Sequence, residues 1–249
     1  MRSETYLRVR EAYEAGELDV LGGQTRLAEE LGVTRQAINT NLKRVKRDLE
    51  DGVRRAVVDR ITAETRIHVE LDIDGTGLAE VATGVGFYDH VLEAFAKHGR
   101  FDLELRCEGD LHVDEHHTME DCALALGAAV DEALGDRSGL VRMGDATVPL
   151  DETLVQAVID CSGRPYAAID LDWGGERIGQ APTEMLGHAL QSFSQGARCA
   201  LHVRQLAGAN DHHIAEAAFK ALGRALDAAT RRDPRIAGEV PSTKGTLTA

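Results

Sequence analysis

The spacing of apolar and polar residues divides the chain into a short helical stretch and a longer region in which strands and helices alternate. Apolar residues recur at helical intervals in "TYLRVREAYEAGEL" and in "TRLAEELGVTRQAINTNLKRVKRDLEDG", where Gly32, Val33 and Thr34 interrupt the pattern. Beyond residue 60, "TRIHVELDID" alternates as a half-buried strand does, and "YDHVLEAFAKHG" has the period of a helix that ends at Gly99. The strand "FDLELRCEG" and the helix "TMEDCALALGAAVDEAL" follow. This pattern predicts an α+β protein preceded by a small all-α segment.

The helical stretch at the N-terminus is predicted to be a unit of its own. Ile38, Leu42 and Val45 share one face of the helix that follows the three-residue turn. Two helices joined by such a turn resemble a helix-turn-helix DNA-binding unit. The stretch "GVRRAVVDRITAET" is expected to connect this unit to the remainder. The predicted domains are therefore residues 1–55 and 56–249.

Basic residues gather near the end of this first segment. Residues 34–55 hold seven basic and three acidic side chains, a local excess that the rest of the chain lacks. DNA is therefore a candidate partner of residues 1–55, and the alternative is that these helices only decorate the protein or help it to assemble. The side chains expected to be exposed and able to reach bases or phosphates are Arg35, Gln36, Asn39, Lys43, Arg44 and Lys46.

The larger region contains an internal duplication. "ETRIHVELDIDG" aligns with "ETLVQAVIDCSG", "DHVLEAF" with "GHALQSF", and "DEHHTMED" with "NDHHIAEA". The two halves run from about 60 to 145 and from about 146 to 235, and a tail of residues 236–249 follows. The predicted fold is thus α+β with two similar tandem β/α halves.

Each half carries an HHxxE motif and one helical histidine upstream of it. Adjacent side chains on a helix diverge by about 100°, so two neighbouring imidazoles do not easily reach one ion. Two equivalent copies predict two ions, with each histidine pair straddling them and with ligands drawn from one chain or from two subunits. Imidazole and carboxylate donors suit manganese, iron or zinc. The eight candidate ligands are His90, His116, His117, Glu120, His188, His212, His213 and Glu216.

Composition narrows the class of protein further. No apolar run approaches the roughly 20 residues that span a bilayer, and no secretory signal is visible at the N-terminus. Four widely spaced cysteines without a CxxC pair argue against a zinc ribbon or a disulfide framework. We therefore expect a cytoplasmic protein without a membrane partner. Residues 58–249 hold 17 basic and 32 acidic side chains, which argues against nucleic-acid binding by the larger part.

Several stretches in a fixed order carry a family resemblance: "GVGFYDHVLEAFAKHGRFDLEL", "HVDEHHTMEDCALALG", "RMGDATVPLDE", "SGRPY", "NDHHIAEAAFKAL" and "VPSTKG". Together they resemble imidazoleglycerol-phosphate dehydratase, an enzyme family of histidine biosynthesis. The likeness runs from about residue 56 to 247 and leaves the N-terminal helices as an addition. It implies helices layered between two sheets, a shell of 24 subunits, and active sites between subunits.

The resemblance also implies roles for individual residues. It implies two Mn²⁺ ions per active site, held by the eight candidate ligands, and a phosphorylated imidazole as substrate. A phosphate dianion needs several donors, and arginine offers a bidentate fork. The candidate catalytic residues are Glu64, Glu120 and Glu216. The candidate substrate-binding residues are Glu64, His90, Lys97, His98, Arg142, Arg164, Lys220, Ser242, Thr243 and Lys244.

The implied reaction removes water from imidazoleglycerol phosphate and gives imidazole-acetol phosphate. The proton on carbon 2 has no neighbouring carbonyl, so a general base alone would remove it slowly. An imidazolate bridged between two Mn ions is electron-rich enough to expel the carbon 3 hydroxyl. Glu64, at the start of the first strand, is the candidate for proton transfer. The alternative function is a DNA-binding regulator with a dehydratase-derived sensor domain, which the intact metal and phosphate residues disfavour.

Overall fold

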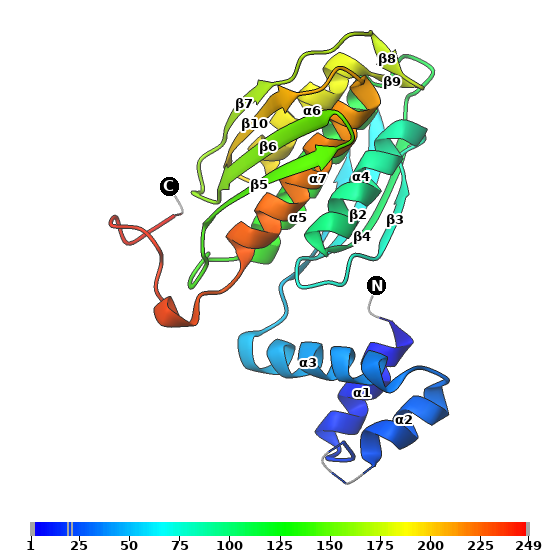
Figure 1. Ribbon diagram of the computed structural model, residues 1–249, viewed down its shortest axis with the longest axis vertical. Helices are drawn as coiled ribbons and strands as arrows, with labels where there is room; N and C mark the ends of the chain where they lie inside the picture. The colour runs from blue at the N-terminus through cyan, green and yellow to red at the C-terminus, as the bar shows by residue number, and fades with distance from the viewer. Residues whose placement is uncertain (1–2, 19, 21, 248–249) are drawn as a thin grey trace. The chain divides into compact units, whose positions relative to one another are not determined.

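The computed structural model describes residues 3–18, 20 and 22–247, except for the side chains of residues 47, 48, 50 and 51. The chain forms two compact units, residues 1–53 and 54–249. The smaller unit contains the helices α1 (Glu4–Glu14), α2 (Gly23–Leu31) and α3 (Arg35–Asp51), coloured blue in Figure 1. The larger unit contains all of the described strands and four further long helices.

The smaller unit is held together by helix caps and a compact core. The side-chain oxygen of Thr34 accepts a hydrogen bond from the backbone N–H of Ala37, which caps α3. Gly32 ends α2 with a φ of 64°, a left-handed conformation that glycine adopts without strain. The predicted apolar face of α3 is confirmed by its place in this core, which consists of Tyr6, Val9, Ala12, Leu18, Leu27, Ala28, Ile38, Leu42 and Val45.

One prediction about α3 is wrong. Arg44 was expected to be exposed, but only 7% of its surface is accessible. Its guanidinium carbon lies 5.3 Å from the ring centre of Tyr6, because an arginine stem can pack over an aromatic face while its charge interacts with the ring. Asn39 is half-buried. The remaining side chains of the predicted set are exposed, as expected: Arg35, Gln36, Lys43 and Lys46.

The larger unit begins earlier than the sequence pattern suggested. Both carboxylate oxygens of Asp74 accept hydrogen bonds from the guanidinium of Arg54, at 2.6 and 2.7 Å, and the carbonyl of Thr230 accepts a third. The boundary between the two units, after Val53, falls within the stretch that was expected to be a connection. The part of that stretch from Arg55 to Ile61 forms the strand β1 (Arg55–Ile61), which was not predicted. The burial of its side chains alternates but their polarity does not, because β1 is an edge strand in which only Ala56 is fully buried.

Two halves with the same topology build the larger unit. The first consists of β1, β2 (Thr65–Asp72), β3 (Ala79–Ala82), α4 (Gly86–Gly99), β4 (Asp102–Gly109) and α5 (His116–Leu134). The second consists of β5 (Met143–Leu150), β6 (Thr153–Asp160), β7 (Tyr166–Asp170), α6 (Thr183–Gly196), β10 (Ala200–Ala207) and α7 (Asp211–Thr230), with a short hairpin of β8 (Arg177–Ile178) and β9 (Ala181–Pro182) before α6. A 3₁₀ turn, Pro234–Ile236, follows α7.

The sheets show the duplication directly. Their strand orders, β1-β2-β4-β3 and β5-β6-β10-β7, correspond position by position. In each sheet three strands are antiparallel and the last, β3 or β7, is parallel to its neighbour. The strand β5 was not predicted. It is an edge strand of the second sheet, as β1 is of the first.

The four long helices of the larger unit form a layer between the two sheets (Figure 1). The helix α5 packs on β1 and β2, and α7 packs on β5 and β6. Within the layer, α5 contacts α6 and α4 contacts α7. The rings of Phe95 and Phe193, which occupy equivalent positions in the two halves, meet edge to face with centroids 5.9 Å apart. The α+β fold with two similar halves is therefore confirmed. In the described part of the chain, every helix is too short or too polar to cross a bilayer.

Glycine lets the central helices approach closely at two equivalent points. A Cβ on Gly127 of α5 would lie 2.5 Å from the carbonyl oxygen of Phe193, and one on Gly223 of α7 would lie 2.4 Å from that of Phe95. Each glycine comes eleven residues after the first histidine of its HHxxE motif. Because these neighbours are backbone atoms of packed helices, they cannot move aside as the end of a flexible side chain would.

Replacing Gly127 by alanine is therefore expected to destabilise the protein by about 1–3 kcal/mol through overpacking. The measurement is the denaturant midpoint of each variant. The control is Gly86→Ala, at the first position of α4, where an added Cβ has nothing within 4 Å. This control should be neutral or slightly stabilising, because alanine is the better helix former. Equal midpoints for the two variants would contradict the close approach of the helices.

Candidate active site

A histidine from the first half meets the HHxxE motif of the second half. His90 on α4 places its Nε2 atom 3.2 Å from Oε2 of Glu216 on α7. The Nε2 atom of His212, one turn before Glu216, lies 3.3 Å from the same oxygen. One ligand atom from each of the three side chains lies within 4.8 Å of the others. We refer to these three residues as cluster A.

The reciprocal arrangement occurs on the other helix pair. Nε2 of His188 on α6 lies 3.1 Å from Oε1 of Glu120 on α5. Nε2 of His116 lies 3.7 Å from Oε2 of the same carboxylate. Their ligand atoms also fall within 4.8 Å of one another, and we refer to these three residues as cluster B. Each cluster therefore combines a histidine of one half with a histidine and a glutamate of the other.

The packing of the helices explains this exchange between the halves. The upstream histidines lie on α4 and α6, and the HHxxE motifs lie at the starts of α5 and α7. Because α4 packs on α7 and α5 packs on α6, the histidine of one half faces the motif of the other half. The sequence pattern predicted all six residues as candidate metal ligands but did not predict which of them would meet.

The second histidine of each pair lies outside both clusters. Nδ1 of His117 is 3.0 Å from Oδ2 of Asp110, and Nδ1 of His213 is 2.8 Å from Oε2 of Glu152. An ionised carboxylate only accepts hydrogen bonds, so each Nδ1 is the donor, and in the neutral imidazole each Nε2 keeps its lone pair. The hydrogen bond to Asp110 raises the pKa of His117, and the hydrogen bond from His213 lowers the pKa of Glu152 to about 2. Metal-ligating histidines are commonly oriented by this kind of bond to a carboxylate.

Glu64 lies beside His117 and belongs to neither cluster. Its Oε1 atom is 3.6 Å from Nε2 of His117, and about half of its side chain is exposed. It lies in the turn before β2, not within the strand. Glu152 holds the equivalent place in the second half, next to His213, and was missed in the sequence analysis. The alignment of "ETRIHV" with "ETLVQA" was the signal that could have identified it.

Five of the predicted substrate-binding residues gather in one cleft of about 630 Å³. Arg142 forms a bidentate ion pair with Asp160, at 2.8 and 3.0 Å, and donates a hydrogen bond to the carbonyl of Pro241 in the tail. This bond holds the tail next to the arginine. The five residues in the lining are Arg142, Arg164, Ser242, Thr243 and Lys244.

Lys220 and His98 lie elsewhere, beside cluster A. Nζ of Lys220 is 2.5 Å from Oε1 of Glu216. Burial raises the pKa of Glu216, but hydrogen bonds from Lys220 and His90 outweigh this and lower it to about 2. Along α7, Lys220 comes nine residues before Ala229, whose carbonyl accepts from the backbone N–H of Arg142. Nine helical residues span about 14 Å. Within one chain Lys220 therefore lies apart from the cleft that contains Arg142 and Arg164. Lys97 is exposed, next to His98 at the end of α4.

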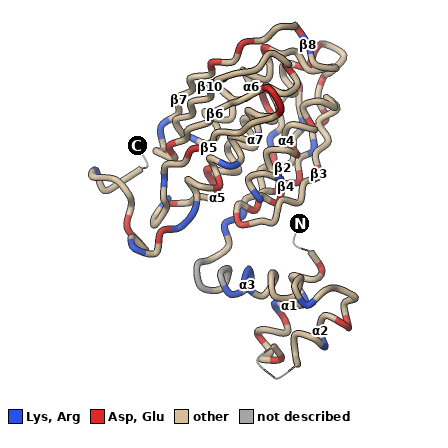
Figure 2. The backbone as a smooth tube through the Cα atoms, viewed as in Figure 1, with Lys and Arg blue, Asp and Glu red and all other residues tan. Residues whose placement is uncertain are grey.

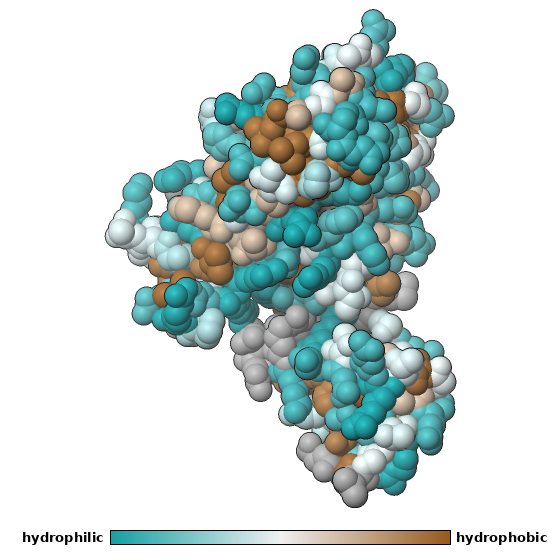
Figure 3. Space-filling view, viewed as in Figure 1, coloured by the Kyte–Doolittle hydropathy of each residue, from teal (hydrophilic) through white to brown (hydrophobic). Residues whose placement is uncertain are grey.

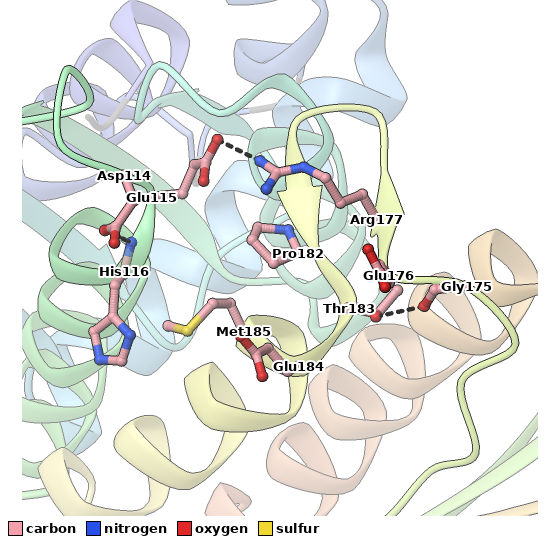
Figure 4. A pocket seen from close by; sticks show the side chains of 10 residues that line it. All are labelled: Asp114, Glu115, His116, Gly175, Glu176, Arg177, Pro182, Thr183, Glu184 and Met185. Carbon is pink, nitrogen blue, oxygen red and sulfur yellow. Dashed lines mark hydrogen bonds and ion pairs between the residues drawn. The ribbon is translucent and has the colours of Figure 1, made fainter.

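An acidic pocket of about 530 Å³ opens beside cluster B (Figure 4). Four carboxylates contribute to its lining, and the loop that includes the β8–β9 hairpin supplies Arg177, which pairs with Glu115 at 2.5 Å. His116 lies at the edge of this pocket in Figure 4. Four carboxylates and one arginine give this pocket a net negative charge, which attracts cations and repels anions. The four carboxylates belong to Asp114, Glu115, Glu176 and Glu184.

The fold and the two clusters define a duplicated α+β protein with paired histidine and carboxylate sites. Residues 83–226 match the family model of imidazoleglycerol-phosphate dehydratase. The chain belongs to this family of hydro-lyases. It is 56% identical over 201 residues to the imidazoleglycerol-phosphate dehydratase of Salinispora arenicola, covering 78% of this chain and 99% of the relative. The relative from Chloroflexus aurantiacus is 51% identical over 195 residues, covering 78% and 95%.

Solved structures agree with this assignment. The chain resembles the crystal structure of IGPD from Pyrococcus furiosus in complex with (S)-C348, with a TM-score of 0.66 and 35% identity, over 76% of this chain and 99% of that one. It resembles the crystal structure of imidazoleglycerol-phosphate dehydratase from Staphylococcus aureus with a TM-score of 0.65 and 31% identity, over 72% and 99%. The matches thus cover almost the whole of the related chains and leave part of this chain unmatched.

The protonation of His98 gives a test of the basic group beside cluster A. Burial lowers the pKa of His98, and the positive charges of Lys220 and Arg224 lower it further. This environment therefore favours the neutral form of the imidazole. Since its folded pKa lies below the unfolded value, its contribution to stability is present above pH 6.5 and is lost as the pH falls through the folded pKa.

Arg224→Gln is expected to raise the pKa of His98, because it removes one of the two named positive charges. The measurement is an NMR titration of the imidazole in metal-free protein. The control is Arg204→Gln, an exposed arginine on β10. If both variants left the titration midpoint of His98 unchanged, the proposed electrostatic environment would be wrong.

Proposed function

We propose that this protein dehydrates imidazoleglycerol phosphate to imidazole-acetol phosphate, with two Mn²⁺ ions at each active site. The observation that carries the proposal is the pair of clusters A and B, in which ligand-type atoms converge from helices of different halves. The family membership supports the reaction, since the relatives from Salinispora arenicola and Chloroflexus aurantiacus bear the name of this dehydratase.

The donor set fits Mn²⁺. Each cluster offers two imidazole nitrogens and one carboxylate, donors that suit manganese and also iron or zinc. The four cysteines lie outside both clusters, so thiolates do not compete. Three protein ligands leave coordination positions for a further side chain and for substrate. When bound, two divalent ions would supply the Lewis acidity that favours the deprotonated imidazole of the substrate.

His117 and His213 are proposed to complete the clusters of neighbouring subunits. Their Nδ1 atoms are held by Asp110 and Glu152, which leaves each Nε2 able to bind a metal. Within one chain they do not join the three-residue groups. A large homo-oligomer, of 24 subunits by resemblance, would bring the missing ligand from another copy.

Exposed apolar residues support such an assembly. Apolar patches interrupt the mostly hydrophilic face seen in Figure 3. Large apolar side chains are exposed on several strands of both sheets, and such residues often mark interfaces between proteins. They include Val57 and Ile61 on β1, Met143 on β5, Tyr166 on β7 and Leu206 on β10.

The remaining residues of the site have roles that follow from their charge and position. The cleft around Arg142 and Arg164 offers several donors to a phosphate dianion. Lys220 lies about 14 Å from the level of Arg142 along α7, so a phosphate would contact both groups only where two chains meet. Glu64, half-exposed beside His117, is the carboxylate proposed to move the proton at carbon 2.

The metal can be tested by removing it. Exhaustive chelation is expected to abolish turnover and to shrink the particle, because ligands shared between subunits make metal binding part of the association energy. Turnover assays and light scattering measure the two effects, and added Mn²⁺ should restore both. A full-size, active protein shown to be free of metal would contradict the proposal.

Metal content distinguishes the clusters. His90→Ala and His188→Ala should each reduce the bound metal, since each removes one ligand from a different cluster. The matched control is His202→Ala, an exposed histidine on β10 outside both clusters. This control should bind as much metal as the unmodified protein. Loss of metal from the control variant to the same extent would show that the clusters are not the metal sites.

Glu64→Gln tests proton transfer separately from metal binding. As a positioned acid or base, Glu64 should contribute on the order of 10²-fold or more to kcat, with metal content unchanged. Glu152→Ala provides the comparison, because it frees Nδ1 of His213 and should weaken metal binding by roughly 10- to 100-fold. Near-normal kcat in Glu64→Gln would assign proton transfer to another group.

A further inference from the structure

The exposed side of α3 is cationic over most of its length. In the sequence between Arg35 and Arg47 there are five basic and no acidic residues. Arg44 is buried, but the other described basic side chains of this run are exposed. We define the cationic face of α3 by the side chains that lie together on its solvent side, which are Arg35, Gln36, Asn39, Lys43 and Lys46.

The positive charges on this face are available to a ligand. Among the residues that the structure describes, Arg35 and Lys43 form no ion pair with a carboxylate. Lys46 lies over the ring of Tyr13, at 5.3 Å from its centroid, and remains exposed. By contrast, Arg8 on α1 pairs with Glu11 and with Glu30. Arg8 on α1 is thus already neutralised by carboxylates, whereas Arg35 and Lys43 on α3 are not.

Charge is segregated within the smaller unit. Arg10 pairs with Glu14, so α1 carries a second internal pair. In Figure 2 α1 and α2 carry both red and blue segments, whereas the coloured segments of α3 are blue. The net charge of the smaller unit is small, so the unit as a whole attracts anions only weakly. Binding of a polyanion would therefore depend on the local positive charge of the cationic face of α3.

The turn and the core hold α3 in a fixed orientation for recognition. The Gly32 cap, the Thr34 cap and the buried face at Ile38, Leu42 and Val45 lock α3 against α1 and α2. Its 17 residues span about 26 Å. The major groove of B-form DNA, about 12 Å wide, admits an α-helix, and the second helix of a helix-turn-helix unit binds there.

We propose that the smaller unit binds double-stranded DNA, with the cationic face of α3 in the major groove. Arg35, Lys43 and Lys46 would contact phosphates and fix the position of the helix on the duplex. Gln36 and Asn39, near the start of α3, carry amides of the kind that pair with adenine in the major groove. This binding is an activity in addition to the dehydration and uses none of its residues.

Two other occupants fit this face less well. The major groove of A-form RNA is deep and narrow, and a helix cannot enter it. A protein partner or a second copy would bury apolar side chains at the centre of the contact. From Arg35 to Lys46 the exposed side chains are polar or charged, and the large apolar ones belong to the core. The face therefore matches a polyanion with a groove.

The test measures DNA binding by the full-length protein and by Arg35→Ala/Lys43→Ala. A fluorescent 30-base-pair duplex of random sequence is titrated at several salt concentrations. The unmodified protein should bind, with log K falling linearly with log salt. The double variant should bind at least about tenfold more weakly at low salt, and its salt dependence should be shallower by about two, one for each lost phosphate contact.

The matched control is Arg8→Ala/Arg10→Ala, which removes the same charge from α1, where both arginines are paired with glutamates. It should bind DNA nearly as well as the unmodified protein, and both double variants should keep normal turnover. Three results would overturn the proposal: no binding by the unmodified protein at low salt, equal loss in the two variants, or equal affinity for double-stranded RNA. A change in particle size without a change in DNA affinity would show that α3 serves assembly instead.

Discussion

The rest of the site depends on the packing of α4 against α7 and of α5 against α6. This packing brings His90 to Glu216 and His188 to Glu120, so each half of the duplication supplies what the other half lacks. One half alone would have an upstream histidine and an HHxxE motif on helices that do not face each other. The close approach at Gly127 and Gly223 sets the distance between the helices and therefore the spacing of the ligand atoms.

The two adjacent histidines of each motif point in different directions because of helix geometry. Neighbouring side chains on a helix diverge by about 100°, and the rings of His116 and His117 are inclined at 73° with centroids 6.0 Å apart. His116 faces its cluster, and His117 is held by Asp110. A chain with this arrangement presents two partly formed sites and two oriented histidines. Under the proposed function, association of several copies would bring those histidines to a metal held by a neighbouring chain.

The sequence predicted which residues belong to the candidate site better than it predicted how they are arranged. Repeated motifs revealed all eight ligand candidates, because a duplicated pattern stands out without any structure. The exchange between halves was not predictable, since it depends on which helices pack together. The strand β1 was missed because its exposed residues Val57 and Ile61 are apolar and hide the alternation. The strand β5 was missed because it contains Gly144 and Pro149, residue types that are depleted in strands. Arg44 was misplaced because its stem packs over Tyr6, a contact that helical spacing does not reveal.

The arrangement of the candidate phosphate-binding residues was also not predictable from the sequence. The sequence named Arg142, Arg164 and Lys220 together, but α7 separates Lys220 from the cleft within one chain. Glu152 was missed although it aligns with Glu64 in the sequence repeat, because one carboxylate near a strand start has no distinctive pattern. In both cases the missing information is a contact between distant parts of the chain.

The most direct test of the exchange between halves is the position of the metal. Anomalous diffraction at the manganese edge, from crystals grown with Mn²⁺, locates each ion without reference to activity. The account predicts two peaks per chain, one within reach of His90, His212 and Glu216 and the other within reach of His116, Glu120 and His188. A single peak, or an ion ligated only by residues of one half, would contradict it.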